Sequence, residues 1–525
     1  MMLVENRSQR IQALRDMPDI DVLIVGAGIN GIGTFRDLAL QGVNVVLIDR
    51  GDYCSGASAA SSHMVHGGIR YLENGEFRLV REAVRERNLL IENAPHLVKP
   101  LPTTFPIFKR FSGLFNAPLK FIGLQNRPSE RGALVLKIGL WFYDWFTRKQ
   151  RTVPVHVFRS RAESLELFPA VNPEVLYTAT YFDAAMPSPE RLAIEVLLDG
   201  WKIGSQTRPL NYVSMLSAHG DSVKLRDEVS GGEFIVKPRI LVNAGGPWID
   251  RINASVGSST RFIGGTKGSH LVLDHPELHR SIGGHEFFFE NKDGRLVLIF
   301  PLEDRVLVGT TDIRVEDPDD VAITEEEIEY FFEMVRRVFP GIQIDRSHIV
   351  YTFSGVRPLV FGSVSEEQIS RDHKIEILEA DHDHGFPIFS LVGGKWTTFR
   401  AFSEQASDAV LTRLKVVRKI NTENLKIGAA RHDQNTDLES TIRDEDVVHL
   451  DDLVFRRTNT AMLGRATEST VRDLAHRTAS VLGWTAEQTT QEIDRVLEIL
   501  RVQHHMEFTR YVNCEENPIT SRSNS

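Results

Sequence analysis

Short apolar runs separated by glycines recur along the chain, and the first of them opens a complete β-turn-α-β unit. Residues 22–25 (VLIV) predict a buried parallel strand, and a glycine-rich turn follows directly. The spacing of apolar residues then predicts a helix over 32–41, ended by Gly42. A second apolar strand is expected over 45–48, just before Asp49. This unit predicts an α/β domain at the start of the chain.

Later segments continue to alternate between strand and helix patterns. A helix is expected from about Glu76, whereas frequent proline and aromatic residues make 95–151 hard to assign. Residues 295–311 predict two strands joined by a turn, and 388–392 predict another buried strand. The C-terminal hundred residues show helical spacing, with a capping box formed by Thr485 and Gln488.

Composition excludes several classes of protein. The 525 residues include 61 Lys and Arg against 71 Asp and Glu, a net charge of −10, which argues against a broad nucleic-acid-binding face. The two cysteines, Cys54 and Cys514, are too few for a disulfide framework or a cysteine metal site. A reducing, cytoplasmic location is therefore expected. The most apolar stretch, 132–147, is too short and too charged to predict a transmembrane helix.

The turn after the first strand has the pattern G-x-G-x-x-G. Gly26, Gly28 and Gly31 allow a tight turn, and the N-terminus of the following helix favours the pyrophosphate of a dinucleotide. Asp49 follows about 20 residues on, where an acid accepts hydrogen bonds from ribose hydroxyls. The alternative is that the glycines serve only the turn. Because a strand precedes them and a helix follows them, we favour the dinucleotide site.

NAD and FAD both use this unit, and two later segments favour FAD. Residues 241–247 (LVNAGGP) predict a strand running into a turn of small residues. Residues 392–398 (VGGKWTT) predict a strand, a glycine pair and a helix start. Backbone without side chains can approach a ligand closely at such turns. A dinucleotide-binding unit followed by two glycine-rich turns of this kind indicates a site that encloses a flavin.

Eight further segments stand out, in chain order: SSHMVHGGIRYLE (61–73), FRLVREAVRERNLL (77–90), APHLVKPLP (94–102), KGSH (267–270), VGTTD (308–312), FSGVRPL (353–359), SRDH (370–373) and VGGKWTTFR (392–400). In these segments, spread over roughly residues 19–412, the chain resembles the FAD-dependent glycerol-3-phosphate dehydrogenase family. The resemblance implies oxidation of a secondary alcohol next to a phosphate ester. It also implies that the electrons pass to a membrane quinone.

The resemblance implies an α/β architecture of three parts. These are a Rossmann-like FAD-binding domain (19–95, 187–260 and 351–412), a discontinuous α+β substrate domain (96–186 and 261–350) and a C-terminal helical cap (413–515). Two positions depart from the family pattern: His63 replaces a usual lysine, and Trp396 replaces a smaller apolar residue. Both lie near the expected flavin and substrate. A tetritol phosphate such as erythritol phosphate therefore stays open as substrate beside glycerol-3-phosphate.

Residues of these segments form the expected cofactor and substrate sites. FAD is expected to contact Gly26, Gly28, Gly31, Asp49, Ser62, His63, His66, Gly67, Gly68, Ala244, Gly245, Gly393, Gly394 and Thr397. A phosphate dianion needs cations, because guanidinium pairs bidentately with its oxygens. The candidate cations are Arg70, Arg357, Arg371 and Lys395. Tyr71, Thr310 and Thr311 are expected to add neutral hydrogen bonds. The alternative is that each arginine forms a structural salt bridge.

Alcohol oxidation also requires a base for the hydroxyl proton, because the flavin takes the hydride. His66 and His270 are candidates since histidine titrates near neutrality, and Lys395 is a third if its pKa is lowered. His66 could instead attach or orient the flavin, and a structural role stays open for each histidine. No metal site is expected, because residues 381–384 (DHDH) have the pattern of a solvated turn.

Residues 101–151 combine positive charge with aromatic side chains. They carry nine Lys or Arg, two Asp or Glu and ten aromatics, a net charge of +7. This pattern suits a peripheral contact with the inner face of the cytoplasmic membrane. The alternative is an aromatic core under a solvated charged face. Two other functions stay open as well: an oxidase on the same fold that releases peroxide, and a nucleotide-binding regulator without catalysis.

Overall fold

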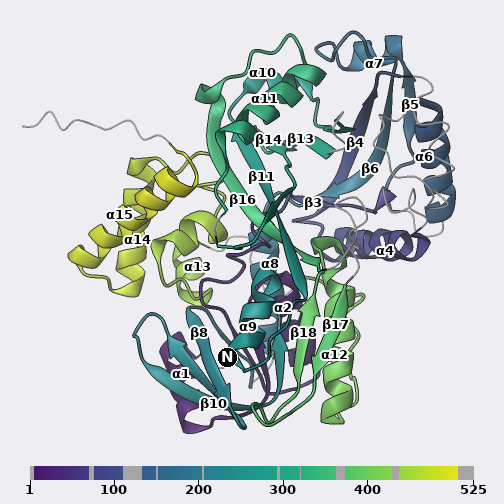
Figure 1. Cartoon of the computed structure of the whole chain (residues 1–525). Helices are drawn as coiled ribbons and strands as arrows, with labels where there is room; N and C mark the ends of the chain where they lie inside the picture. Colours follow the sequence, from purple (N-terminus) through teal and green to yellow (C-terminus); the bar gives the residue numbers. More distant parts are fainter. Residues whose placement is uncertain are drawn as a thin grey trace, which may run out of the picture.

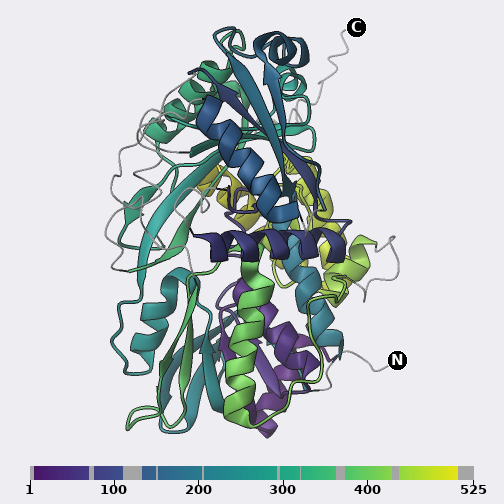
Figure 2. The same cartoon turned by 90° about the vertical axis from the view of Figure 1, so that its right-hand side faces the viewer.

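The computed structural model describes residues 5–69, 76–109, 133–148, 152–203, 206–291, 296–319, 321–361, 373–428 and 437–506. Figures 1 and 2 show a lower part and an upper part, each containing a β-sheet. In Figure 1 the C-terminal helices lie to one side. In Figure 1 the long strand β16 (Ile349–Val360) runs from the upper part towards the lower one.

The lower sheet is mainly parallel and contains the unit predicted at the start of the chain. Its strands in spatial order are β17 (Lys374–Leu378), β18 (Ile388–Val392), β10 (Glu233–Asn243), β1 (Asp19–Val25), β2 (Val45–Ile48) and β7 (Arg208–Leu210), while β8 (Val213–His219) and β9 (Ser222–Asp227) extend β10. Only β17 among the six ordered strands pairs antiparallel to its neighbour. A parallel sheet needs cover on both faces, which explains the continuous apolar runs of the sequence.

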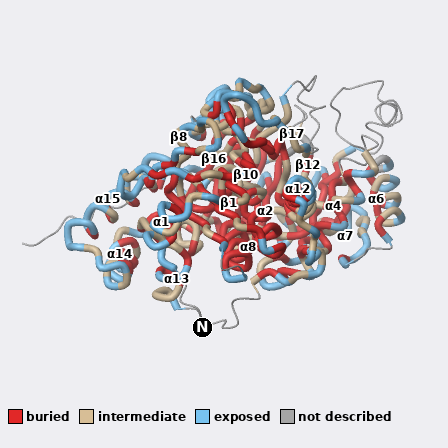
Figure 3. Tube along the Cα trace, turned by 90° about the horizontal axis from the view of Figure 1, so that it is seen from below, coloured by how far each residue is buried: buried red, intermediate tan, exposed pale blue. Residues whose placement is uncertain are grey.

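Helices cover one face of the lower sheet, and a helix with a hairpin covers the other. The first face packs against α2 (Ile29–Leu40), α8 (Pro189–Ile203) and α12 (Phe399–Leu414). The second face packs against α1 (Arg7–Asp16) and the β8–β9 hairpin. Figure 3 shows β1, α2 and α8 buried in the middle of the molecule. The N-terminus of α2 is thus fixed beside the carboxyl ends of the parallel strands, where ligands of such sheets bind.

The upper sheet is mainly antiparallel and is covered by helices on both faces. Its order is β15 (Ile313–Val315), β11 (Ile263–Leu273), β14 (Arg305–Gly309), β13 (Leu296–Leu302), β12 (Glu286–Glu290), β4 (Lys99–Ile107), β6 (Tyr177–Ala185) and β3 (Met64–Val65); β16 also pairs with β11, and β5 (Val157–Ser160) with β6. One face packs against α11 (Glu325–Val338) and α10 (Pro276–Ser281). At the far end, α6 (Ala133–Thr147) packs on β4 and β6, and α4 (Phe77–Asn93) packs on α6.

The C-terminal helices share a core with the other face of the upper sheet. They comprise α13 (Leu438–Asp444), the π-helical turn η5 (Asp452–Arg457), α14 (Glu468–Leu482) and α15 (Ala486–Gln503). Leu453, Val471 and Val496 pack in one cluster with Phe300 and Tyr351 of the sheet. The remaining short helices are α7 (Arg161–Leu167), α9 (Ile249–Ser255), η2 (Gly246–Trp248), η3 (Arg346–His348) and η4 (Trp396–Thr398).

The structure confirms the predicted α/β class with a helical C-terminal region. The strands at 22–25, 45–48 and 388–392 are present, and the capping box at Thr485 begins α15. The first helix begins at Ile29 rather than at 32, because Gly28 is its N-cap and the glycine at position 31 already belongs to it. The domain boundaries stay a prediction. Two strands that lie within the expected FAD-binding segments, β3 and most of β16, pair in the upper sheet. In the described part of the chain, none of the helices is long and apolar enough to cross a membrane.

Candidate functional site

The glycine turn between β1 and α2 packs closely against the segment that follows β10. A Cβ on Gly26 would lie 2.6 Å from the Ala244 carbonyl oxygen, and one on Gly31 would lie 1.9 Å from the Gly26 oxygen. Both glycines are therefore required for close backbone packing. Gly28 is the N-cap of α2 and gives it no side-chain cap, so the helix start can face an anion.

Asp49 ties this turn to the segment that follows β2. Its carboxylate accepts hydrogen bonds from the backbone N–H of Ala27 at 2.7 Å and of Gly51 at 2.9 Å. Burial raises the pKa of the Asp49 carboxyl to about 6. Each carboxylate oxygen still has a lone pair beyond these bonds. Its contact with a ribose stays a prediction that this geometry allows.

The second and third glycine-rich segments adjoin the turn. The backbone N–H of Ala244 donates to the Val25 carbonyl at 2.8 Å, and that of Gly245 donates to the side chain of its strand neighbour Asn243 at 3.1 Å. Asn30 of α2 donates from Nδ2 to the Gly393 carbonyl at 3.2 Å. A Cβ on Gly394 would come within 2.5 Å of that Nδ2. These expected cofactor residues thus surround the start of α2.

Residues 58–68 complete the wall of the site. Trp396 donates from Nε1 to the Ser58 carbonyl at 2.9 Å, and Thr397 donates from Oγ1 to the His66 carbonyl at 3.4 Å. Gly67 donates from its backbone N–H to Asp183 Oδ1 at 2.6 Å. Gly68 has a φ of 74°, a left-handed conformation that suits glycine. The segments 58–68 and 393–397 are therefore bonded to each other.

His63 lies in this wall as a neutral imidazole. Its Nδ1 lies 2.9 Å from the Pro187 carbonyl oxygen, and the side chain is fully buried. Burial lowers the pKa of His63 to about 4. Its Nε2 is buried without a hydrogen-bond partner among the described residues. A neutral ring thus stands where the resembled family has a cationic lysine.

His270 on β11 contacts the segment before β3 and the neighbouring strand β16. Its Nε2 lies 2.8 Å from Ser62 Oγ, and its ring stacks on Phe353 with centroids 4.6 Å apart. Gly309 leaves room for the ring, because a Cβ there would lie 2.2 Å from His270 Cδ2. Burial, with the nearby Arg357 and His63, lowers the pKa of His270 well below its usual value. Its Nδ1 also has no hydrogen-bond partner within the described ranges.

Arg357 on β16 lies on the strand beside His270. Its guanidinium donates to Thr310 Oγ1 at 2.8 Å, to the Thr311 carbonyl at 3.1 Å and to Asp312 Oδ1 at 3.2 Å. A Cβ on Gly268 would lie 2.2 Å from this guanidinium, so the glycine makes room for it. The Arg357 side chain is 30% exposed and its partner Asp312 is 34% exposed. The salt bridge considered as an alternative is present. The guanidinium is partly exposed, and its contact with a phosphate stays a prediction.

A buried network behind Arg357 was not expected from the sequence. Glu327 of α11 accepts from Lys267 Nζ at 2.8 Å, Ser269 Oγ at 2.8 Å and Thr311 Oγ1 at 2.6 Å. The Thr311 hydroxyl, expected to bind substrate, is thus engaged with Glu327, and its role toward substrate stays a prediction. The sequence pattern that could have singled out Glu327 is T-x-x-E at 324–327, which forms a capping box at the start of α11.

The remaining expected residues fall into two groups. Lys395 is half-buried and is the N-cap of η4, which places it beside the segment 393–397. His66 is half-buried in the wall that Thr397 contacts. Arg70, Tyr71 and Arg371 lie outside the described residues.

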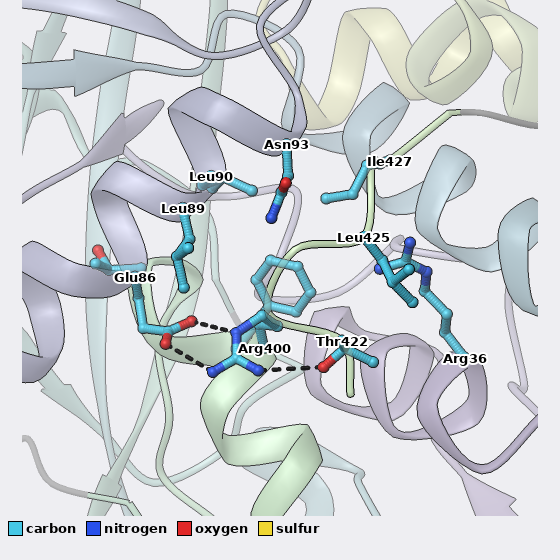
Figure 4. A pocket seen from close by; sticks show the side chains of 11 residues that line it. Arg36, Glu86, Leu89, Leu90, Asn93, Arg400, Thr422, Leu425 and Ile427 are labelled. Carbon is cyan, nitrogen blue, oxygen red and sulfur yellow. Dashed lines mark hydrogen bonds and ion pairs between the residues drawn. The ribbon is translucent and has the colours of Figure 1, made fainter. Parts of the chain in front are cut away.

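A small pocket lies behind the site, between α4 and α12 (Figure 4). Thr397 lines it, and Arg400 donates to both carboxylate oxygens of Glu86 at 2.8 Å and to Thr422 Oγ1 at 3.1 Å. These bonds hold α12, which follows the segment 393–397, against α4. The Arg400 bonds therefore support the segment 393–397.

The described residues fit a flavin dinucleotide. The glycine turn offers an anion site at the α2 N-terminus, and Asp49 stands at the expected ribose position. Two buried imidazole nitrogens, on His63 and His270, have no partner within the described part of the chain. Buried polar atoms are normally hydrogen-bonded, so unpaired ones beside glycine-rich backbone indicate a bound group.

Comparisons with known proteins agree with this site. The family model described as FAD dependent oxidoreductase matches residues 21–400. A glycerol-3-phosphate dehydrogenase of Synechocystis sp. is 35% identical over 77% of this chain and 72% of its own length. A D-erythritol 1-phosphate dehydrogenase of Brucella abortus is 32% identical over 73% of this chain and 72% of its own.

A solved structure agrees in fold. It is a glycerol-3-phosphate dehydrogenase from Bacillus halodurans complexed with FAD, with a TM-score of 0.71 and 20% identity, and it covers 94% of this chain and 98% of its own. The resemblance seen in the sequence, the expectation of FAD and the expectation of an enzyme are thereby confirmed. This chain belongs to the FAD-dependent oxidoreductase family.

Proposed function

We propose that this chain oxidises the secondary hydroxyl of a small polyol phosphate to the corresponding keto phosphate. The observation that carries the proposal is the Arg357 guanidinium beside the buried, neutral His270 imidazole, next to the expected flavin segments. A cation next to a proton acceptor suits a phosphate ester with a hydroxyl on the neighbouring carbon. The names of the relatives, glycerol-3-phosphate dehydrogenase and D-erythritol 1-phosphate dehydrogenase, support this substrate class.

The cofactor would be held by the residues around the glycine turn. The α2 N-terminus would bind the pyrophosphate, Asp49 the ribose, and segments 62–68 and 393–397 the ring system. Bound FAD supplies the hydride acceptor for the substrate carbon.

The side chains of the chain bind the substrate and move its proton. Arg357, which is partly exposed, would bind the phosphate, oriented by its bonds to Thr310 and Asp312. His270 would take the hydroxyl proton at Nδ1 when its Nε2–H donates to Ser62. The lowered pKa of His270 keeps the imidazole neutral, and so able to accept a proton, at pH 7. His66 and Lys395 stay as the other candidate bases.

Anaerobic bleaching of the flavin absorbance of the holoenzyme tests this function. We would add glycerol-3-phosphate, erythritol phosphate, glycerol and erythritol in separate experiments. Bleaching by a phosphate ester but not by the free polyols is the expected result. Failure of every phosphate ester to bleach the flavin would overturn the proposal and favour a non-catalytic regulator. Peroxide release in air without an added quinone would instead show an oxidase.

We propose that His63 and Trp396 influence which polyol phosphate is preferred. Both side chains are buried in the wall of the site, and Trp396 is fixed by its bond to Ser58. A neutral imidazole at position 63 does not compete with Arg357 for the phosphate as a lysine would. His63→Lys is therefore expected to change the ratio of kcat/KM between glycerol-3-phosphate and erythritol phosphate. An unchanged ratio would assign the preference to other residues.

We propose that the electrons pass to a membrane quinone and that α6 forms a peripheral membrane contact. Four apolar side chains of α6 form an exposed stripe: Leu134, Ile138, Trp141 and Trp145. Trp141 is 62% exposed and Trp145 is 48% exposed. Arg148 lies over the Trp145 ring, 5.6 Å from its centroid, which places positive charge at one end of the stripe. Exposed tryptophan next to cations is typical of helices that lie in an anionic membrane interface.

A further inference from the structure

The segment 49–58 forms the outer wall of the glycine turn. Ala27 is held from both sides, because its N–H donates to Asp49 at 2.7 Å and its carbonyl accepts from the Cys54 N–H at 2.9 Å. The first N–H of α2, on Ile29, donates to Ser58 Oγ at 3.0 Å. The position of this segment therefore determines the geometry of the turn that would bind the pyrophosphate.

The C-terminal helices hold the opposite face of the same segment. Arg457 of the π-helical turn η5 donates to both oxygens of Asp52, at 2.6 Å and 2.9 Å. Arg456 donates from Nε to the same carboxylate at 2.5 Å, and Asn211 donates from Nδ2 at 3.0 Å. The side chains of Asp52 and Arg457 are completely buried. The next residue of the segment, Tyr53, donates from its hydroxyl to Asp446 of the C-terminal region at 2.9 Å.

The arginines are themselves fixed within the C-terminal region. Arg457 donates to the Glu445 carbonyl at 2.9 Å, and Arg456 donates to Asp451 at 2.9 Å and Asp452 at 2.7 Å. Burial alone would raise the pKa of the Asp52 carboxyl, but the two guanidinium groups hold it below its usual range. The carboxylate is therefore charged. The two parallel bonds from the Arg457 guanidinium, here called the fork, fix its direction as well as its distance. Single π-helical turns inside helical segments are frequent at functional sites.

A buried ion pair is an inefficient way to attach one part of a protein to another. Desolvation of both charges offsets most of their attraction, and well-packed apolar residues often stabilise such a contact more. The family model ends at residue 400, so the pair joins the cofactor part to a region outside it. This pair therefore fixes the orientation of Asp52 rather than strengthening the attachment of the C-terminal region.

We propose that Arg457 is a positioning residue for the cofactor: through Asp52 it holds the segment 49–58 against the glycine turn and slows the release of FAD. The proposal rests on the FAD site and not on the identity of the substrate. Loss of the fork is expected to loosen the Asp49 and Cys54 bonds to Ala27 while the C-terminal helices stay attached through their shared apolar core.

The test measures FAD release from the holoenzyme, followed as the rise of free-flavin fluorescence after dilution, well below the unfolding temperature. Arg457→Met is expected to speed release at least tenfold, and Arg457→Lys to restore part of the wild-type rate because the charge returns without the fork. The matched control is Arg191→Met. Arg191 of α8 donates to Glu445 of the C-terminal region at 2.8 Å, and within the described part of the chain it forms no ion pair with segment 49–58.

The control should lower the Tm, as expected for a lost ion pair, and leave FAD release within about twofold of wild type. Equal acceleration by Arg191→Met and Arg457→Met would overturn the proposal, because general loosening of the C-terminal region would then explain it. Unchanged release in Arg457→Met would overturn it as well. Should Arg457→Met fail to fold, Asp52→Asn removes the charge while it keeps the side-chain shape, and the same tenfold acceleration is expected.

Discussion

At the scale of single residues, the site depends on side chains from neighbouring antiparallel strands. On β11 and β16, His270 lies opposite Phe353 and Thr266 lies opposite Arg357, so the proposed base and the cation are placed by one strand register. Glycines at 268 and 309 leave the space that these two side chains fill. A short stretch of backbone pairing thus fixes both groups that the proposed reaction needs.

Replacement of Arg357 tests its proposed contact with phosphate. Charge-assisted bonds contribute roughly 1.5–3 kcal/mol, so Arg357→Met should lower kcat/KM about 10- to 100-fold, mainly through KM. Arg357→Lys should recover only part of the loss, because lysine lacks the bidentate fork. Steady-state kinetics with the polyol phosphate that bleaches the flavin measures both. Arg314→Met, an exposed arginine on β15, is the control, and an equal loss in it would contradict the assignment.

Glu327 is expected to act on substrate binding through Thr311. Its carboxylate bonds the Thr311 hydroxyl, and the Thr311 carbonyl accepts from Arg357. Glu327→Gln should raise KM for the polyol phosphate by about fivefold and change kcat less, because one charged acceptor is lost and Arg357 is retained. Glu326→Gln, an exposed neighbour in the same helical turn, is the control. A fall in kcat with KM unchanged would contradict this role.

At the scale of elements, sequence patterns predicted those strands and helices that are specified locally. The strands β1, β2 and β18 are continuous apolar runs because both faces of the lower sheet are covered. The glycine turn, His270 and Arg357 lie in segments that the sequence singled out. Two sets of contacts could not be predicted: those that Glu327 makes with β11 and Thr311, and the pair formed by Arg457 and Asp52. Both join residues that are separated in the chain, and Asp52 and Arg457 are 405 positions apart.

The exposed stripe on α6 predicts binding to membranes. Figure 3 shows α6 at the rim of the molecule. Trp141 and Trp145 are exposed, whereas Leu136 and Leu140 of the same helix join the core. Insertion of apolar surface gives roughly 25 cal/mol per Å², so the double variant Trp141→Ser, Trp145→Ser should reduce binding at least tenfold. Sedimentation with vesicles containing anionic lipid measures this.

The control for the stripe is Ile377→Ser, which removes an exposed apolar side chain from β17 of the lower sheet. It should bind vesicles like the wild type. Binding of the wild type should also weaken with added salt, because cations beside the stripe attract anionic lipid. Equal vesicle binding by the double variant and the wild type would show that α6 is not the contact.

At the scale of the whole molecule, the two sheets and the C-terminal helices meet at the site, and so stability and function are linked there. Ser62 from the cofactor part bonds His270 of the upper sheet, while Asp52 bonds Arg457 of the C-terminal region. The sequence predicted the order of these parts along the chain. It could not predict how they meet, because buried ion pairs leave no periodic pattern in a sequence.

A buried acid in the upper sheet makes the stability of the molecule depend on pH. Glu286 begins β12, accepts from Thr103 Oγ1 at 2.8 Å and is completely buried. Burial raises the pKa of the Glu286 carboxyl to about 8. The folded protein thus keeps this proton at pH 7, whereas an unfolded chain releases it above its ordinary pKa of about 4.3. Between these values the unfolded state binds fewer protons, so the free energy of unfolding falls as pH rises.

Glu286→Gln should remove this slope, because glutamine is neutral in both states. Its Tm should fall less than that of the wild type between pH 5.5 and 8.5, by a few degrees, corresponding to roughly 1–4 kcal/mol. Thermal unfolding of the holoenzyme at both pH values measures the difference. Glu333→Gln, an exposed carboxylate on α11, should keep the wild-type slope, since its carboxyl is solvated in both states. Parallel Tm–pH curves for Glu286→Gln and the wild type would show that Glu286 is charged in the folded protein.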